Sequence, residues 1–217
     1  MVRVKICGVT SLAEARLAEQ NGADAVGLLV GRLHVAPDFV EPNVARDIAL
    51  SLPPFIVPVL VTHLETRQEL SVLASTIPCP VIQLHSDLSA STLRDLRAQL
   101  CPKKIIGKVS VEDDTAVDRV REIERFVDAI VLDSRDPTTD RVGGTGIVHD
   151  WSVSARIVSA SSVPIILAGG LTPENVATAI ATVRPWGVDV NSGVETREGA
   201  KSEERIRRFV MAVRNAL

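Results

Sequence analysis

The sequence predicts a (β/α)8 barrel, a closed ring of parallel strands in which each strand is followed by a helix. Two observations lead to this fold class. Short apolar runs alternate with helix-like segments along all 217 residues, which is the pattern of parallel α/β folds. Near the end of the chain, Gly169-Gly170 and Ser192-Gly193 each follow an apolar run, and such barrels commonly hold a phosphate after strands seven and eight.

The apolar runs have the length and composition of buried parallel strands. An open doubly wound sheet is the rival fold, but its phosphate glycines usually follow the first strand, and Cys7-Gly8-Val9-Thr10 lacks a Gly-x-Gly pattern. We therefore favour the closed barrel and expect a single domain over residues 1–217. The expected strands are Val2–Cys7, Ala25–Val30, Phe55–Val61, Val81–Leu84, Lys104–Val109, Ala129–Leu132, Pro164–Ala168 and Gly187–Val190.

The helices are indicated by their end signals. Ser11 and Glu14 have capping-box spacing, and Asn21-Gly22 ends the first helix. Thr172 is a good N-cap and Pro173 fits the first helical position, so a helix dipole is expected directly behind the first glycine turn. The later helices are expected over Asn43–Ser51, Thr66–Ser75, Ser89–Gln99, Asp114–Arg125, Asp150–Ser159, Pro173–Thr182 and Ser202–Ala216.

Composition and charge argue against several function classes. The net charge is −3 and no basic face stands out, so nucleic acid is not an expected partner. No apolar run approaches the roughly twenty residues that cross a bilayer, and residues 1–7 read as a strand, so we expect a cytoplasmic enzyme without a membrane partner. A monomer or homodimer is expected, although no sequence feature distinguishes these two states. Cys7, Cys79 and Cys101 are scattered, without disulfide or zinc-ligand spacing, and no metal site is expected.

Chemistry in a barrel lies at the carboxyl ends of the strands, which places Cys7 and Asp133 at the site. Cys7 is either a base or nucleophile, its pKa lowered by nearby positive charge, or a small buried hydrophobe. Asp133 caps its loop, pairs with a lysine, or is a general acid whose proton is held by a partly dry site. Asp189 lies inside the last strand and points either into the barrel or toward the helices.

Gln83 and His85 alternate onto one face of the fourth strand, so both can reach the barrel mouth, as substrate contacts or as structural hydrogen bonds. Gly143-Gly144-Thr145-Gly146 is a phosphate cradle, a mobile lid or a plain connection. The phosphate interpretation is stronger for Gly169-Gly170 and Ser192-Gly193, because two such turns occur in the right order.

Six segments follow the pattern of one known family. They are Lys5-Ile6-Cys7-Gly8-Val9-Thr10, Gln83-Leu84-His85, Leu132-Asp133-Ser134, Gly143-Gly144-Thr145-Gly146 with Asp150-Trp151, Leu167-Ala168-Gly169-Gly170-Leu171 with Pro173-Glu174-Asn175-Val176, and Gly187-Val188-Asp189-Val190-Asn191-Ser192-Gly193-Val194-Glu195. Together, and in this order, they resemble the phosphoribosylanthranilate isomerases of tryptophan biosynthesis.

The resemblance implies an Amadori rearrangement of an aminoribose phosphate to a 1-amino-1-deoxyketose, with no metal or organic cofactor and a small sugar phosphate as partner. It implies that Asp133 protonates the furanose ring oxygen and that Cys7 takes the C2′ proton. Gln83 and His85 are expected to contact the substrate. The residues expected to bind phosphate are Gly144, Thr145, Gly146, Gly169, Gly170, Asn191, Ser192 and Gly193.

The chain departs from the family where the aglycone binds. A Ser-Pro-Arg-Tyr-Val-like segment usually follows strand two, and its Arg addresses the anthranilate carboxylate. Here the loop is slightly longer and Asp38 holds the Arg position. An acid there repels a substrate carboxylate, and Arg32 is the candidate for supplying the lost charge. Ser86 and Ile147 replace the Gly and Lys of two further family motifs.

Three functions remain open at this point. The favoured one is an isomerase of phosphoribosylanthranilate, because Cys7, Asp133 and the glycine turns are all retained. The second is a relative that isomerises a different N-substituted aminosugar phosphate, with Asp38 facing a cationic or neutral aglycone. The third is a phosphosugar-binding protein without catalytic activity.

Overall fold

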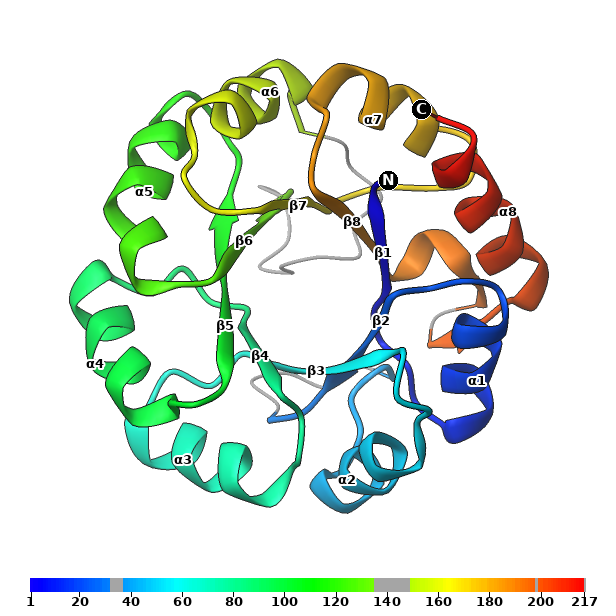
Figure 1. The fold of residues 1–217 in the computed structure, drawn as a ribbon, viewed down its shortest axis with the longest axis horizontal. Coiled ribbons are helices and arrows are strands. Elements are labelled where there is room, and N and C mark those ends of the chain that lie inside the picture. The colour runs from blue at the N-terminus through cyan, green and yellow to red at the C-terminus, as the bar shows by residue number, and fades with distance from the viewer. Residues whose placement is uncertain (32–36, 135–148, 198, 217) are drawn as a thin grey trace.

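The strands of the chain close into a parallel barrel surrounded by helices (Figure 1). The structure is a computed structural model and describes residues 1–31, 37–134, 149–197 and 199–216. β1 pairs with both β2 and β8, which closes the ring and confirms the predicted fold class. The barrel strands are β1 (Arg3–Ile6), β2 (Ala25–Leu29), β3 (Val57–Thr62), β4 (Val81–Leu84), β5 (Lys104–Ser110), β6 (Ala129–Asp133), β7 (Ile165–Leu167) and β8 (Gly187–Val190).

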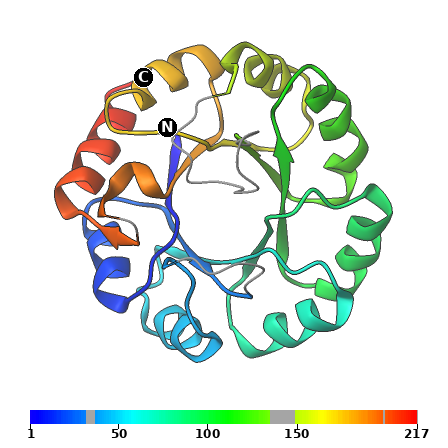
Figure 2. The same cartoon turned by 180° about the vertical axis from the view of Figure 1, so that it is seen from behind.

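A helix follows each strand, and the view from behind shows the same unbroken outer ring (Figure 2). Within the described ranges, no helix is long and apolar enough to span a bilayer. The helices are α1 (Leu12–Gln20), α2 (Pro42–Ser51), α3 (Arg67–Thr76), α4 (Ala90–Leu100), α5 (Thr115–Ile123), α6 (Trp151–Ala160), α7 (Val176–Val183) and α8 (Glu203–Arg214), with the short 3-10 helices η1 (Glu124–Phe126) and η2 (Ser192–Val194).

Side chains along each strand alternate between two apolar cores. Val4 and Ile6 of β1 belong to the core between the barrel and the helices, whereas Cys7 belongs to the core inside the barrel. The inner core also contains Val61 and Val131. Because the alternation is strict, every second residue near a strand's carboxyl end faces the mouth of the barrel.

Apart from small shifts of element ends, the structure differs from the predicted elements at the start of the third strand and after η2. Phe55 was expected in the third strand, but it is 97% exposed and β3 begins at Val57, opposite Ala25. A short antiparallel pair, β9 (Glu195–Arg197) and β10 (Ala200–Lys201), follows η2 and was not predicted. Strands this short give too little alternation to be recognised from sequence.

Candidate active site

The carboxyl ends of the strands bring the predicted acid and base into one barrel mouth. Asp133 is the last residue of β6. Cys7 follows β1 and continues its ladder, because its N–H donates to the carbonyl of Val190 at 2.8 Å. Both side chains are buried, and the alternation of each strand turns them inward. They reach this interior from strands separated by β7 and β8.

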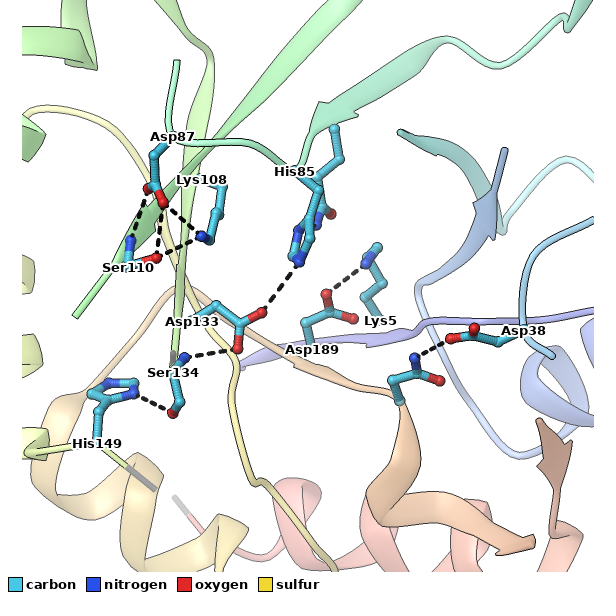
Figure 3. Close-up of polar contacts among 12 residues, drawn as sticks. Lys5, Asp38, His85, Asp87, Lys108, Ser110, Asp133, Ser134, His149 and Asp189 are labelled. Atoms are coloured by element: carbon cyan, nitrogen blue, oxygen red, sulfur yellow. Dashed lines mark hydrogen bonds and ion pairs between the residues drawn. The ribbon is translucent and has the colours of Figure 1, made fainter. Parts of the chain in front are cut away.

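Both carboxylate oxygens of Asp133 are engaged. Its Oδ1 accepts from the backbone N–H of Ser134 at 2.8 Å, and its Oδ2 lies 3.3 Å from Nε2 of His85 (Figure 3). The Ser134 hydroxyl bonds to Nδ1 of His149 at 2.9 Å, and Nε2 of His149 bonds to the Ser154 hydroxyl at 2.7 Å. This network fixes the orientation of the Asp133 carboxylate.

Gln83 and His85 point into the barrel together, as predicted. The amide Nε2 of Gln83 lies 2.9 Å from Nδ1 of His85, and an amide nitrogen can only donate. Nδ1 therefore accepts, and the proton of the neutral imidazole is on Nε2, which faces Asp133. Gln83 thus selects the tautomer that donates to the carboxylate. Contact of either residue with a substrate stays a prediction.

The pKa of Asp133 lies below its ordinary value. Burial alone would raise this pKa, but the hydrogen bond from His85, the charge of Lys108 and the N–H of Ser134 together outweigh burial. The expectation that a partly dry site keeps Asp133 protonated is therefore wrong, because the polar neighbours stabilise the carboxylate.

Cys7 belongs to a buried charged cluster that the sequence analysis missed. Lys5 lies two residues earlier on the same face of β1 and directly opposite Asp189 of β8. The Lys5 Nζ bonds to the Asp189 Oδ2 at 2.6 Å and also interacts with the Cys7 thiol. Asp189 therefore points into the barrel, one of the two orientations left open. Gly27 of β2 makes room, since a Cβ there would lie 2.7 Å from the Cys7 sulfur.

Burial raises the pKa of the Cys7 thiol to about 11, although the charge of Lys5 opposes this rise. The expectation of a lowered pKa is therefore wrong. Lys5 shares its charge with Asp189, and desolvation of the thiolate is the larger effect. A thiol with this pKa is protonated near neutral pH.

A second buried lysine reaches the interior from β5. The Lys108 Nζ bonds to the Asp87 Oδ2 at 2.9 Å and to the Ser110 hydroxyl (Figure 3). Its charge helps to lower the pKa of Asp133. The sequence signal for both missed lysines is alternation: Lys5 precedes Cys7 by two residues, and Lys108 follows the inward-facing Ile106 by two.

The first predicted phosphate turn follows β7. Gly169 and Gly170 both have positive φ, 80° and 64°, a conformation that glycine adopts without strain. A Cβ on Gly169 would come within 2.2 Å of the Ser134 hydroxyl oxygen. The turn therefore lies against the segment that follows Asp133.

The helix behind this turn begins later than predicted. α7 begins at Val176, with Asn175 before it, and residues 173–175 form a turn. The Asn175 Oδ1 accepts from the Thr172 N–H at 2.8 Å, and its Nδ2 donates to the Gly170 carbonyl at 2.9 Å. The predicted helix start at Pro173 is therefore three residues too early. The capping role of Thr172 is supported, because its hydroxyl oxygen accepts from the Glu174 N–H at 3.2 Å and its carbonyl accepts from the Val176 N–H at 3.1 Å.

The second predicted phosphate turn follows β8 and includes η2. A Cβ on Gly193 would lie 1.9 Å from the Leu171 carbonyl oxygen, so only glycine fits this close approach. The two glycine turns therefore meet, as their order in the sequence predicted. The side chain of Asn191 accepts a hydrogen bond from the buried Lys201. Phosphate binding by Gly169, Gly170, Asn191, Ser192 and Gly193 stays a prediction.

Of the remaining predicted site residues, the structure describes only Asp38. Its Oδ2 accepts from the Asn191 Nδ2 at 2.8 Å. Among the described residues, no three or more His, Cys, Asp or Glu are grouped so that they could hold a metal ion. Arg32, Gly144, Thr145 and Gly146 lie outside the described residues.

A closed barrel with a carboxylate–imidazole pair and a buried thiol at one mouth defines an acid–base enzyme of the (β/α)8 class. The family model for N-(5'phosphoribosyl)anthranilate (PRA) isomerase matches residues 4–212. The chain belongs to this family, which confirms the resemblance drawn from its motifs.

Known proteins resemble the chain over its full length. N-(5'-phosphoribosyl)anthranilate isomerase 2 from Methanosarcina mazei is 42% identical over 99% of this chain and 95% of its own. The solved phosphoribosyl anthranilate isomerase from Thermotoga maritima has a TM-score of 0.87 and 33% identity, with 99% of both chains covered. A solved phosphoribosyl anthranilate isomerase in complex with reduced 1-(o-carboxyphenylamino)-1-deoxyribulose 5-phosphate has a TM-score of 0.83 and 32% identity, again with 99% of both chains covered.

Proposed function

We propose that this protein isomerises N-(5′-phosphoribosyl)anthranilate to 1-(o-carboxyphenylamino)-1-deoxyribulose 5-phosphate in tryptophan biosynthesis. The observation that carries the proposal is the convergence of Asp133 and Cys7 on one barrel mouth in a member of this family. The two glycine turns after β7 and β8 support it, because they offer backbone N–H groups to a phosphate at the same mouth.

The first step opens the sugar ring. Asp133, in its protonated form, gives its proton to the furanose ring oxygen, and the bond between that oxygen and C1′ breaks. The lone pair of the aniline nitrogen forms a C1′=N double bond, so the products are a protonated Schiff base and a C4′ hydroxyl. His85 then stabilises the carboxylate that Asp133 has become, since its Nε2–H faces Oδ2.

The second step moves a proton from carbon. The Cys7 thiolate removes the C2′ proton, the electrons of the C–H bond form a C1′=C2′ double bond, and the nitrogen recovers its lone pair. The resulting enolamine becomes the ketone when O2′ loses a proton and C1′ gains one. The ammonium of Lys5 stabilises the thiolate, because it lies against Cys7 on β1.

The reactive protonation state is a minor one. The pKa of Asp133 is lowered and the pKa of Cys7 is raised to about 11, so near neutral pH the proton is mostly on sulfur and not on the carboxyl. The proposed reaction starts from the other tautomer, in which Cys7 is a thiolate and Asp133 carries the proton. Both tautomers hold the same number of protons, so their ratio does not change with pH between the two pKa values. The small population of the reactive tautomer lowers the rate but adds no pH dependence there.

The glycine turns are proposed to hold the phosphate and thereby to fix the sugar between the acid and the base. The aglycone then lies toward the part of the mouth formed by the loop after β2. Arg32 remains the candidate that meets its carboxylate. Gln83 acts on the substrate through His85, with which it shares a hydrogen bond.

The product of a reaction in D2O tests this proposal. Purified protein and freshly prepared phosphoribosylanthranilate should yield the ketose, with solvent deuterium at C1, because the enolamine takes its C1′ proton from an exchangeable source. Cys7→Ala should leave the substrate unchanged. Cys79→Ala is its matched control, since Cys79 is buried but lies ahead of β4 at the opposite end of the barrel. A folded protein that leaves the substrate unchanged would overturn the proposal.

We also propose that the enzyme acts in the cytoplasm as a monomer or homodimer. A biosynthetic family and the finding that no described helix could span a bilayer support this setting. Light scattering of the purified protein gives the mass, and a larger assembly would contradict the proposal.

A further inference from the structure

The Asp38 carboxylate is directed at the end of β8. Its Oδ2 accepts a hydrogen bond from the Asn191 Nδ2 at 2.8 Å, so the segment after β2 is tied to a residue 153 positions away in the chain (Figure 3). The resemblance described above places Asp38 where the family usually has an arginine. Its charge already has a partner within the protein.

Asn191 is held from its other side by a buried ion pair. The Lys201 Nζ donates to the Asn191 side-chain oxygen and, at 3.3 Å, to the Asn191 carbonyl. Lys201 is paired with the Glu195 carboxylate at 2.6 Å, and its side chain is fully buried. Since Lys201 fixes the amide oxygen, the amide nitrogen must point to Asp38.

Asn191 also packs against the turn that follows Cys7. Gly8 has a φ of 68°, and a Cβ there would lie 2.4 Å from the Asn191 Oδ1. The position of this amide is therefore coupled both to the backbone after the base and to the glycine turn that begins at Ser192.

The residues next to Asp38 also contact β2 and the region after β8. Pro37 lies against the β9–β10 connection, where a Cβ on Gly199 would come within 2.8 Å of the proline ring. Phe39 forms a bridge with Leu29, and the Val40 N–H donates to the Leu29 carbonyl at 2.9 Å. Residues 37–40 thus connect β2 to the region after β8, and the Asp38 carboxylate makes the hydrogen bond to that region.

We propose that Asp38 is a positioning residue that holds the Asn191 amide in place for phosphate binding, and that it does not contact the aglycone. The inference rests on the proposed function only for the identity of the sugar phosphate. Its central element, the link between Asp38 and phosphate binding, can be measured with inorganic phosphate alone.

The test compares Asp38→Ala and Asp38→Asn by isothermal titration with inorganic phosphate and by steady-state kinetics. Asp38→Ala removes the acceptor, and we expect phosphate affinity to fall about tenfold, the scale of one hydrogen bond to a charged group. KM for phosphoribosylanthranilate should rise similarly, with kcat nearly unchanged. Asp38→Asn keeps an acceptor oxygen and should retain most of the affinity. Asp47→Ala, an exposed carboxylate on α2, is the matched control.

Other outcomes overturn the inference. If both variants bind phosphate more tightly, Asp38 acts by charge repulsion. If phosphate affinity is unchanged while KM for the full substrate shifts, Asp38 addresses the aglycone. A wild-type protein that binds no phosphate also refutes it. Phosphate binding that depends on Asp38 without any turnover would instead refute the proposed function and leave the inference standing.

Discussion

At the scale of single residues, the environments of Asp133 and Cys7 act in opposite directions. Asp133 receives N–H donors at both oxygens, so its charged form is stabilised and its pKa is lowered. Cys7 is buried beside the Lys5–Asp189 ion pair, and burial raises its pKa to about 11. Asp133 therefore has a lower pKa than Cys7. The reactive state nevertheless holds the proton on Asp133, the group that binds it less tightly.

This arrangement predicts a flat pH profile. Between the two pKa values, the fraction of the reactive tautomer does not change with pH, so kcat/KM should vary less than about threefold from pH 7 to pH 10. The measurement is kcat/KM in overlapping buffers, above the range where the substrate phosphate titrates. A tenfold rise per pH unit would indicate that Cys7 acts without Asp133, and a tenfold fall would indicate the reverse.

At the scale of secondary-structure elements, two strand glycines face opposite sides of the barrel wall. One faces the active site and the other faces the core between the barrel and the helices. Gly27 of β2 faces the interior, where a Cβ would lie 2.7 Å from the Cys7 sulfur and 3.1 Å from the Lys5 side chain. Gly107 of β5 faces the helices, where a Cβ would lie 3.0 Å from Val127. The two positions have similar steric limits on opposite sides of the barrel wall.

Gly27→Ala and Gly107→Ala therefore form a matched pair. Both should lower the free energy of unfolding by about 1–3 kcal/mol, the usual cost of overpacking. Gly27→Ala should also lower kcat by at least about tenfold, because it displaces the base. Gly107→Ala should keep kcat near wild type. Urea unfolding and initial rates measure both effects, and equal losses of kcat would show that the interior position has no special role.

At the scale of the whole molecule, Asp128 links the start of β6 to α4 and β5 at the amino-terminal side of the barrel. Its carboxylate accepts from Arg97 of α4, from the Lys104 Nζ at 3.0 Å and from the Ile105 N–H at 2.9 Å. Burial alone would raise the pKa of Asp128, but these donors outweigh it and lower the pKa well below its usual range. The folded state therefore binds this proton less tightly than the unfolded state.

The stability from Asp128 is present above the unfolded pKa of about 4 and is lost as the pH falls toward the lower folded value. Asp128→Asn should lower the free energy of unfolding by about 1–2 kcal/mol at pH 7, a modest value because Arg97 and Lys104 are partly exposed. The difference in the free energy of unfolding between variant and wild type should become smaller from pH 5 to pH 2. Urea unfolding at several pH values measures this difference, and a difference that does not change with pH would contradict the link between Asp128 protonation and stability.

Most of the barrel could be predicted from sequence because each strand is a local apolar run and each helix carries its own end signals. The acid, the base and the glycine turns could be placed because strand ends are local features too. The errors came from non-local effects. Burial outweighs the charge of Lys5 at Cys7, so the pKa of the thiol is raised where a lowered value was expected. The contact between Asp38 and Asn191 joins distant segments and has no sequence signal.

The central claim is that Asp133 and Cys7 together rearrange phosphoribosylanthranilate. The most direct measurement is the loss of substrate fluorescence with wild type, Cys7→Ala and Asp133→Asn, each first verified as folded by circular dichroism. We predict rapid loss with wild type and a rate lower by at least about 100-fold in each variant, the usual scale of a general acid or base. A near-wild-type rate in either folded variant would contradict the claim.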